Sequence, residues 1–302
     1  MLNELMNIIR RIFGMDHSWE MLTFPRVQID PASARSLTQV LQPAHTIRLR
    51  PDPMESGPLA ATPRLTWHGI TDTGMVRPHN EDDLAHLKVN GNSLFVVADG
   101  MGGHDAGEVA SSVAVRTVSS EIRRIAVLSR DPLGAVERAI QAANAVVHQE
   151  AVRKGSNMGT TLAVALVIDG VAHIGNVGDS RIYWIENGSI TQLTEDHSLV
   201  AKLVSAGKLT KEEARTDPRS NLLYRTIGID GAVRTATTRW ELKTGGTLLL
   251  CTDGLWNEVS DEEIYRICAE EKQTELICAR LVQLANANGG RDNITAIAVK
   301  VL

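Results

Sequence analysis

The sequence predicts an α+β fold in which the sheets are mostly antiparallel. Two long helical patterns, 106–129 and 133–153, follow each other with no strand between them. Short apolar runs rich in β-branched residues then come in close succession, separated by Gly, Asn and Asp, as expected for strands joined by hairpins. Alternating strand and helix winding would not place the two helices together, so layered antiparallel sheets are favoured.

The strand pattern begins at about Thr66 and continues to the end of the chain. Strands are predicted at 66–71, 93–98, 161–168, 171–177, 181–186, 190–193, 233–240, 246–252 and 294–301. A third long helix is predicted at 261–287, and a shorter helical stretch near 197–215. No internal repeat of fixed period interrupts this order.

Residues 1–65 are predicted to be a separate N-terminal extension. Seven of the ten prolines lie at or before Pro63, so about 15–65 is predicted to be an extended linker. Ahead of it, apolar residues at helical spacing (Leu2, Leu5, Met6, Ile9, Ile12, Phe13) predict a short amphipathic helix. This helix is expected to pack on its own domain, on a second copy or on a partner. Membrane attachment is disfavoured, because only two arginines support it and Glu4 opposes them.

Composition limits the function classes. The 302-residue chain has a net charge of -5 and a pI near 6.0, which argues against a nucleic-acid partner. Three cysteines without CxxC spacing predict neither a disulfide framework nor a structural zinc site. No apolar run is long enough to span a membrane, and no export signal is recognisable, so a cytoplasmic location is expected.

Two buried strands are each predicted to deliver an aspartate at their end. Leu94–Ala98 leads into Asp99-Gly100, and Leu248–Thr252 leads into Asp253-Gly254. Either Asp-Gly pair alone could simply start a turn. An ionised carboxylate beside a core is costly, however, unless it is paired, hydrogen-bonded or bound to metal.

Further acidic clusters adjoin other predicted strands, at Asn80–Asp83, Gly178–Arg181 and Arg291–Asn293. Oxygen ligands with little His or Cys suit Mg²⁺ or Mn²⁺ and disfavour zinc. The sequence therefore predicts a site for a hard divalent cation, built from carboxylates of distant segments.

Six motifs in order give a specific resemblance. They are Asp72-x-Gly74-x-x-Arg77-x-x-Asn80-Glu81-Asp82, Val97–His104 (VADGMGGH), Gly159-Thr160-Thr161, Asn176–Arg181 (NVGDSR), Thr252-Asp253-Gly254 and Asp292-Asn293. Over about 66–302 the chain resembles metal-dependent protein serine/threonine phosphatases of the type 2C family, bacterial type. The resemblance implies a catalytic domain at 66–302 with a four-layer αββα sandwich, two mostly antiparallel sheets flanked by helix pairs.

The resemblance also implies the site residues. Asp99 would bridge two Mn²⁺ or Mg²⁺ ions, with Asp253 and Asp292 completing one site. Glu81, through water, and the carbonyl of Gly100 would serve the other. Asp179 would share a third, weaker position with Asp253.

The implied reaction is hydrolysis of phosphoserine and phosphothreonine on proteins by water activated between the cations. Arg77 would bind the phosphate, since its guanidinium presents a planar fork of donors. The alternative for Arg77 is a surface salt bridge with Glu81 or Asp82. The implied partners are phosphorylated proteins, Ser/Thr kinases and their targets.

Two departures from the family pattern matter. Many eukaryotic relatives carry a histidine after the first metal-binding Asp-Gly as a general acid, and this chain has Met101. His104 does not match that position and is expected to be a turn or helix-start histidine. Residues 196–225 resemble a mobile flap beside the active site that contacts substrate protein; the alternative is an ordinary helical insertion.

Other phosphatase chemistries are excluded by inspection. No cysteine has an arginine five residues later, which the cysteine-dependent enzymes need, and Asp99 does not begin an Asp-x-Asp pair. The glycines at 100–107 break the GxGxxG spacing of a dinucleotide loop. A catalytically inactive scaffold remains the alternative from another class, although it would have no need for mutually repelling carboxylates.

Overall fold

The structure is a computed structural model that describes residues 64–102, 106–125, 131–186 and 188–302. The predicted N-terminal helix, the linker and His104 lie outside these residues. The described residues all belong to one compact unit, Ala60–Leu302.

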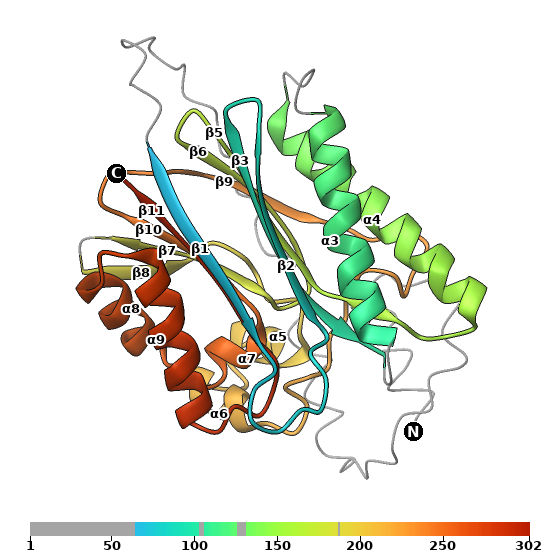
Figure 1. Ribbon diagram of the computed structural model, residues 1–302. Coiled ribbons are helices and arrows are strands. Elements are labelled where there is room, and N and C mark those ends of the chain that lie inside the picture. Colours follow the sequence, from blue (N-terminus) through green and yellow to red (C-terminus); the bar gives the residue numbers. More distant parts are fainter. Residues whose placement is uncertain (1–63, 103–105, 126–130, 187) are drawn as a thin grey trace. The chain divides into compact units, whose positions relative to one another are not determined.

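Two antiparallel sheets form the centre of this unit (Figure 1). The five-stranded sheet has the order β1 (Leu65–Asp72), β11 (Ile294–Val301), β10 (Thr247–Cys251), β7 (Arg181–Glu186) and β8 (Ser189–Gln192). The six-stranded sheet has the order β2 (Asp82–Val89), β3 (Asn92–Met101), β5 (Leu162–Ile168), β6 (Val171–Val177) and β9 (Ala236–Glu241), with β4 (Gly159–Thr160) paired to β3.

Helices cover the outer face of each sheet (Figure 1). The pair α3 (Ala106–Ile125) and α4 (Pro132–Lys154) packs on the six-stranded sheet, and the pair α8 (Asp261–Glu270) and α9 (Thr274–Ala287) on the five-stranded one. Short helices α5 (Leu199–Ser205), α6 (Lys211–Thr216) and α7 (Asp253–Trp256) lie in the connections. The expected four-layer α+β sandwich is confirmed.

Three layers of buried side chains hold the sandwich together. One layer lies between α3, α4 and the six-stranded sheet, a second between the two sheets, and a third between the five-stranded sheet and α8 with α9. The central layer includes Phe95, Trp184 and Ile297, all nearly inaccessible. β3 and β10 each face two of these layers, which explains their continuous apolar runs.

The predicted single helix at 261–287 is wrong, because the chain forms two helices separated by Glu271–Gln273. The last buried residue of α8 is Cys268 and the next, after the break, is Thr274 followed by Ile277. In one unbroken helix, at about 100° per residue, the nine steps from Cys268 to Ile277 would place these two side chains on opposite faces. Breaking the helix lets both segments face the same sheet.

Two further elements differ from the prediction. β2 was not predicted, because its sequence DDLAHLKV mixes charged residues into an edge strand and weakens the alternating pattern. The stretch near 197–215 forms α5 and α6 instead of one helix, with Gly207 at positive φ (66°) in the connection between them.

Candidate active site

Acidic residues from both sheets meet at one end of the sandwich. Asp99 lies near the end of β3, and Asp82 opens β2 directly opposite it in the antiparallel register. In the other sheet, Asp253 follows β10 and Asp292 precedes β11, two strands that are antiparallel neighbours. Asp179 lies between β6 and β7, where the chain passes from one sheet to the other.

Asp99 is the centre of this acidic cluster. Burial raises the pKa of its carboxyl well above the ordinary value, and the neighbouring charges of Asp82, Asp253, Asp179 and Asp292 raise it further. Directly opposite residues on antiparallel strands have Cβ atoms about 5 Å apart, so Asp82 and Asp99 repel each other strongly when both are ionised. The structure therefore brings together all four aspartates that were predicted to bind metal.

The other aspartates are perturbed in the same direction. Burial raises the pKa of Asp253 to about 6, helped by the charge of Asp292, whereas a side-chain hydrogen bond with Asp99 lowers it. Burial and the charge of Asp253 raise the pKa of Asp179 well above its ordinary value. Several buried carboxyls that raise one another's pKa are typical of a functional site, and a bound cation would remove the repulsion.

Three buried carboxylate oxygens in this cluster have no hydrogen-bond partner among the residues that the structure describes: Glu81 Oε1, Asp82 Oδ1 and Asp253 Oδ1. Buried polar atoms are nearly always satisfied, so unsatisfied oxygens in one place indicate that a cation completes the site. The donor set, all oxygen, fits Mg²⁺ or Mn²⁺.

Glu81 and Gly100 are held at the cluster by very close backbone packing. The amide of Gly100 donates to the carbonyl of Glu81 at 3.1 Å, and a Cβ on Gly100 would lie 2.2 Å from the carbonyl oxygen of Gly107. A Cβ on Gly107 would lie 2.5 Å from Glu81 Oε1. A side chain at position 100 would collide with backbone, and one at position 107 would displace the Glu81 carboxylate, so the two glycines allow this carboxylate to lie beside the end of β3.

Arg77 lies at the rim of the cluster. Its Nη2 donates to Asp292 Oδ2 at 2.7 Å, and its side chain is 44% exposed. The ion pair is thus formed with a predicted metal ligand, and not with Glu81 or Asp82 as in the alternative drawn from the sequence. Five donors on one guanidinium leave room for a phosphate as well.

The carboxylates do not form a finished metal cage as they lie. Within the described residues, no three His, Cys, Asp or Glu side chains stand in an arrangement that could hold one ion. Two carboxylates are turned away from a common point by other interactions: Asp292 is bound to Arg77, and Asp253 shares a hydrogen bond with Asp99. The side chains of Asp253 and Asp292 would have to rotate to coordinate one ion, but the backbone already brings the aspartates to the same end of the sandwich.

Hydroxyl groups orient the acids. The amide of Asp99 donates to Thr161 Oγ1 at 2.9 Å, and that hydroxyl also bonds Ser180 Oγ at 2.7 Å. Asp82 Oδ2 accepts from the hydroxyls of Thr252 and Thr295, at 2.8 and 2.7 Å. Partners of this kind normally fix the orientation of metal-binding carboxylates.

Asp179 is fixed from two sides. The indole of Trp256, in α7, donates to its carbonyl oxygen at 3.1 Å. On the other side, His197 forms two hydrogen bonds with Gly178, the residue before Asp179. The His197 amide donates to the Gly178 carbonyl, and the Gly178 amide donates to His197 Nδ1, both at 3.0 Å. Burial and the charge of Arg225 lower the pKa of His197 to about 3, so its ring is neutral.

The segment 196–225 packs beside this part of the site. Arg181 forms a bidentate, largely buried ion pair with Asp196 and stacks on the Trp256 ring at 3.5 Å. Arg215 in α6 donates to the Trp256 carbonyl at 2.8 Å. The segment is therefore attached to the residues that carry Asp179 and Asp253, although its contact with substrate protein stays a prediction.

Sequence reasoning did not assign a role to Asp82 or Gly107. Asp82 stands in the quoted Asn80-Glu81-Asp82 motif, but β2 was not recognised, so its position opposite Asp99 could not be inferred. The tight fit of Gly107 against Glu81 depends on the approach of α3 to the end of β3, for which the sequence gives no local signal. Met101 is 37% exposed, and its thioether carries no proton to donate.

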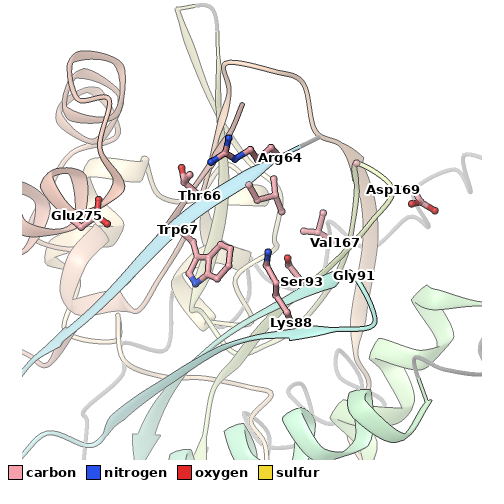
Figure 2. A pocket seen from close by; sticks show the side chains of 11 residues that line it. Arg64, Thr66, Trp67, Lys88, Gly91, Ser93, Val167, Asp169 and Glu275 are labelled. Carbon is pink, nitrogen blue, oxygen red and sulfur yellow. The ribbon is translucent and has the colours of Figure 1, made fainter. Parts of the chain in front are cut away.

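A separate cavity of about 490 Å³ lies at the opposite ends of the strands (Figure 2). Its walls include Trp67, Lys88 and Ser93, and Ser93 is six residues along β3 from Asp99, about 20 Å in an extended strand. Its charged residues have both signs and no buried carboxylates converge there. We assign the chemistry to the acidic cluster.

Comparison with known proteins identifies the family. A family model described as protein phosphatase 2C matches residues 77–295. The serine/threonine phosphatase stp of Listeria monocytogenes is 40% identical over 235 residues, which are 76% of this chain and 93% of that protein. The structure of the serine/threonine phosphatase Stp1 from Staphylococcus aureus is similar with a TM-score of 0.75 at 34% identity, covering 84% of this chain and 100% of that one.

The catalytic domain of the phosphatase PstP, solved in complex with two manganese ions, is similar with a TM-score of 0.71 at 32% identity, over 79% of this chain and 98% of that one. The fold is that of a metal-dependent phosphatase. The chain belongs to the protein phosphatase 2C family and is a protein serine/threonine phosphatase. No helix among the described residues is long and apolar enough to cross a bilayer.

Proposed function

We propose that the acidic cluster holds two divalent cations, Mn²⁺ or Mg²⁺. Asp99 would be shared by the two sites, Asp253 and Asp292 would complete one of them, and the carbonyl of Gly100 with Glu81, through water, would serve the other. Asp179 would provide, with Asp253, a third and weaker position. Asp82, which the sequence did not single out, supports the cluster from the opposite strand.

One observation carries this proposal: Asp99 is buried among four further aspartates, while nearby carboxylate oxygens lack hydrogen-bond partners. Such a cluster is unfavourable for the fold by itself, because each charge raises the cost of ionising the next. The manganese-bound PstP domain supports the same metal class for this chain.

When bound, the cations neutralise the phosphoryl oxygens and lower the pKa of water. The chain's own residues position the substrate. Arg77 exchanges its bond with Asp292 for two phosphate oxygens, which orients the phosphorus toward the cluster. Met101 supplies no proton, so the residue after Gly100 is not the general acid in this enzyme.

The substrates are phosphoserine and phosphothreonine residues of proteins, and the enzyme opposes Ser/Thr kinases by acting on them and on their targets. The catalytic domain comprises 66–302. The extension 1–65 binds a partner or a second copy of the chain. Cytoplasmic function agrees with cysteines that are free and buried, Cys251, Cys268 and Cys278. Nothing supports the inactive-scaffold alternative.

The test is manganese-dependent release of phosphate from a phosphothreonine peptide by the full chain. We expect activity to disappear in chelator and to fall at least 100-fold in Asp99→Ala and in Asp253→Ala, the scale of loss typical when charge stabilisation is removed. Glu262→Ala, at an exposed position in α8, is the matched control. Full activity of the wild-type chain in chelator would refute the metal mechanism.

A further inference from the structure

The loop between β1 and β2 presents two neighbouring apolar side chains to water. Met75 is 70% exposed and Val76 is 65% exposed. Among the other large apolar residues of the described chain, only Val152, on α4, is exposed to a similar degree. Single exposed apolar residues need no explanation, but an adjacent pair beside a binding site does.

The loop is held rigidly in this conformation. The Met75 amide donates to the Gly290 carbonyl at 2.8 Å, and Asn293 Nδ2 donates to the carbonyls of Thr73 and His79, both at 2.9 Å. The side chains are thus kept outside by a fixed backbone. Their exposure is a property of the folded loop, which would otherwise gain by turning them inward.

The loop also lies directly against the active site. Gly74 has a φ of 78°, and a Cβ there would lie 2.1 Å from the carbonyl oxygen of Asp292. Arg77, one residue after Val76, bonds the Asp292 carboxylate. A phosphorylated side chain bound by Arg77 would therefore bring its neighbouring residues over Met75 and Val76.

We propose that Met75 and Val76, the 75–76 surface, bind an apolar side chain of the substrate protein within about three residues of the phosphorylated residue. This inference rests on the proposed function, since it takes Arg77 as the phosphate-binding group. Burial of apolar area favours an apolar neighbour, and the aspartates of the cluster repel an acidic one. The substrate class is a phosphoserine or phosphothreonine flanked by an aliphatic residue.

The experiment compares two phosphothreonine peptides that differ only in Leu or Ser at flanking positions, with the full chain in saturating manganese. We expect wild type to prefer the Leu peptide about three- to tenfold in kcat/KM, through KM, which is the range for one partly covered aliphatic side chain. In Met75→Ser and Val76→Ser the preference should fall toward 1. Val152→Ser should keep it.

Hydrolysis of a small aryl phosphate separates the possible failures. If wild type hydrolyses both peptides equally well, or if the preference survives in Met75→Ser/Val76→Ser, the 75–76 surface is refuted while the phosphatase activity stands. If the aryl phosphate is hydrolysed and neither peptide is, the proposed function is wrong and this inference falls with it. Equal losses on the aryl phosphate and on both peptides would assign Met75 and Val76 a structural role and overturn the proposal.

Discussion

Asp82→Asn should stabilise the metal-free enzyme at neutral and alkaline pH. Burial raises the pKa of Asp82 from 3.8 to about 7, while the hydroxyls of Thr252 and Thr295 lower it. The amide oxygen of asparagine can still accept from both hydroxyls, which bond only Oδ2 in the wild type. The substitution therefore removes the charge and keeps the hydrogen bonds.

The sign follows from the raised pKa. Well below pH 3.8 the carboxyl is protonated in both folded and unfolded chains. As pH rises toward 7, the unfolded chain ionises first, so the folded state loses stability. The shift from 3.8 to about 7 corresponds to about 4 kcal/mol as an upper limit, or a melting temperature about 10 °C higher for Asp82→Asn at pH 8.

The assay is thermal unfolding of both proteins in chelator between pH 4.5 and pH 8. Removing the charge of Asp82 also makes the pKa of Asp99 less raised, which stabilises the folded variant in the same direction, so the difference in Tm between the two proteins is the quantity to follow. It should be smallest at pH 4.5, grow as pH rises toward 7, and level off above that pH. Asp217→Asn is the control, because a hydrogen bond from Arg219 lowers the pKa of Asp217 to about 2 and its effect is constant in this range. A pH-independent difference for Asp82→Asn would refute the reasoning.

Three further substitutions test the way the site is held. Thr161→Val removes the acceptor for the buried Asp99 amide, so titration should show manganese affinity reduced about tenfold and Tm should fall by several degrees because a buried donor loses its partner; unchanged affinity would contradict this. Gly107→Ala brings a Cβ 2.5 Å from Glu81 Oε1 and should displace that carboxylate. Phosphopeptide turnover should then fall at least about tenfold. Full turnover would show that activity does not need the Glu81 carboxylate in its present position. Arg77→Lys loses the planar fork, so KM for a phosphopeptide should rise about tenfold; an unchanged KM would exclude Arg77 as the phosphate ligand.

Much of the fold followed from local pattern. The apolar runs ending in Asp99 and Asp253 identified two central strands, because strands that face two cores are apolar throughout. The edge strand β2 escaped detection, since its charged residues obscure the alternation. The break between α8 and α9 depends on which face must meet the sheet, and this is decided by tertiary packing.

The candidate site was predictable as a set of acids, and not as a geometry. Strand ends showed where Asp99, Asp253 and Asp292 should lie, and all three do meet at one end of the sandwich. The position of Asp82 opposite Asp99 required the strand register. The ion pair between Arg77 and Asp292 links segments 215 residues apart, so no local pattern could have predicted it.

The central claim is that carboxylates of distant segments share cations. The most direct test counts the manganese ions bound by the full chain, with free Mn²⁺ followed by electron paramagnetic resonance, in wild type and in Asp99→Asn. We predict two tightly bound ions for wild type, and the loss of at least one, with weaker binding of the other, when the bridging carboxylate is removed. Equal stoichiometry and affinity in the two proteins would contradict the account.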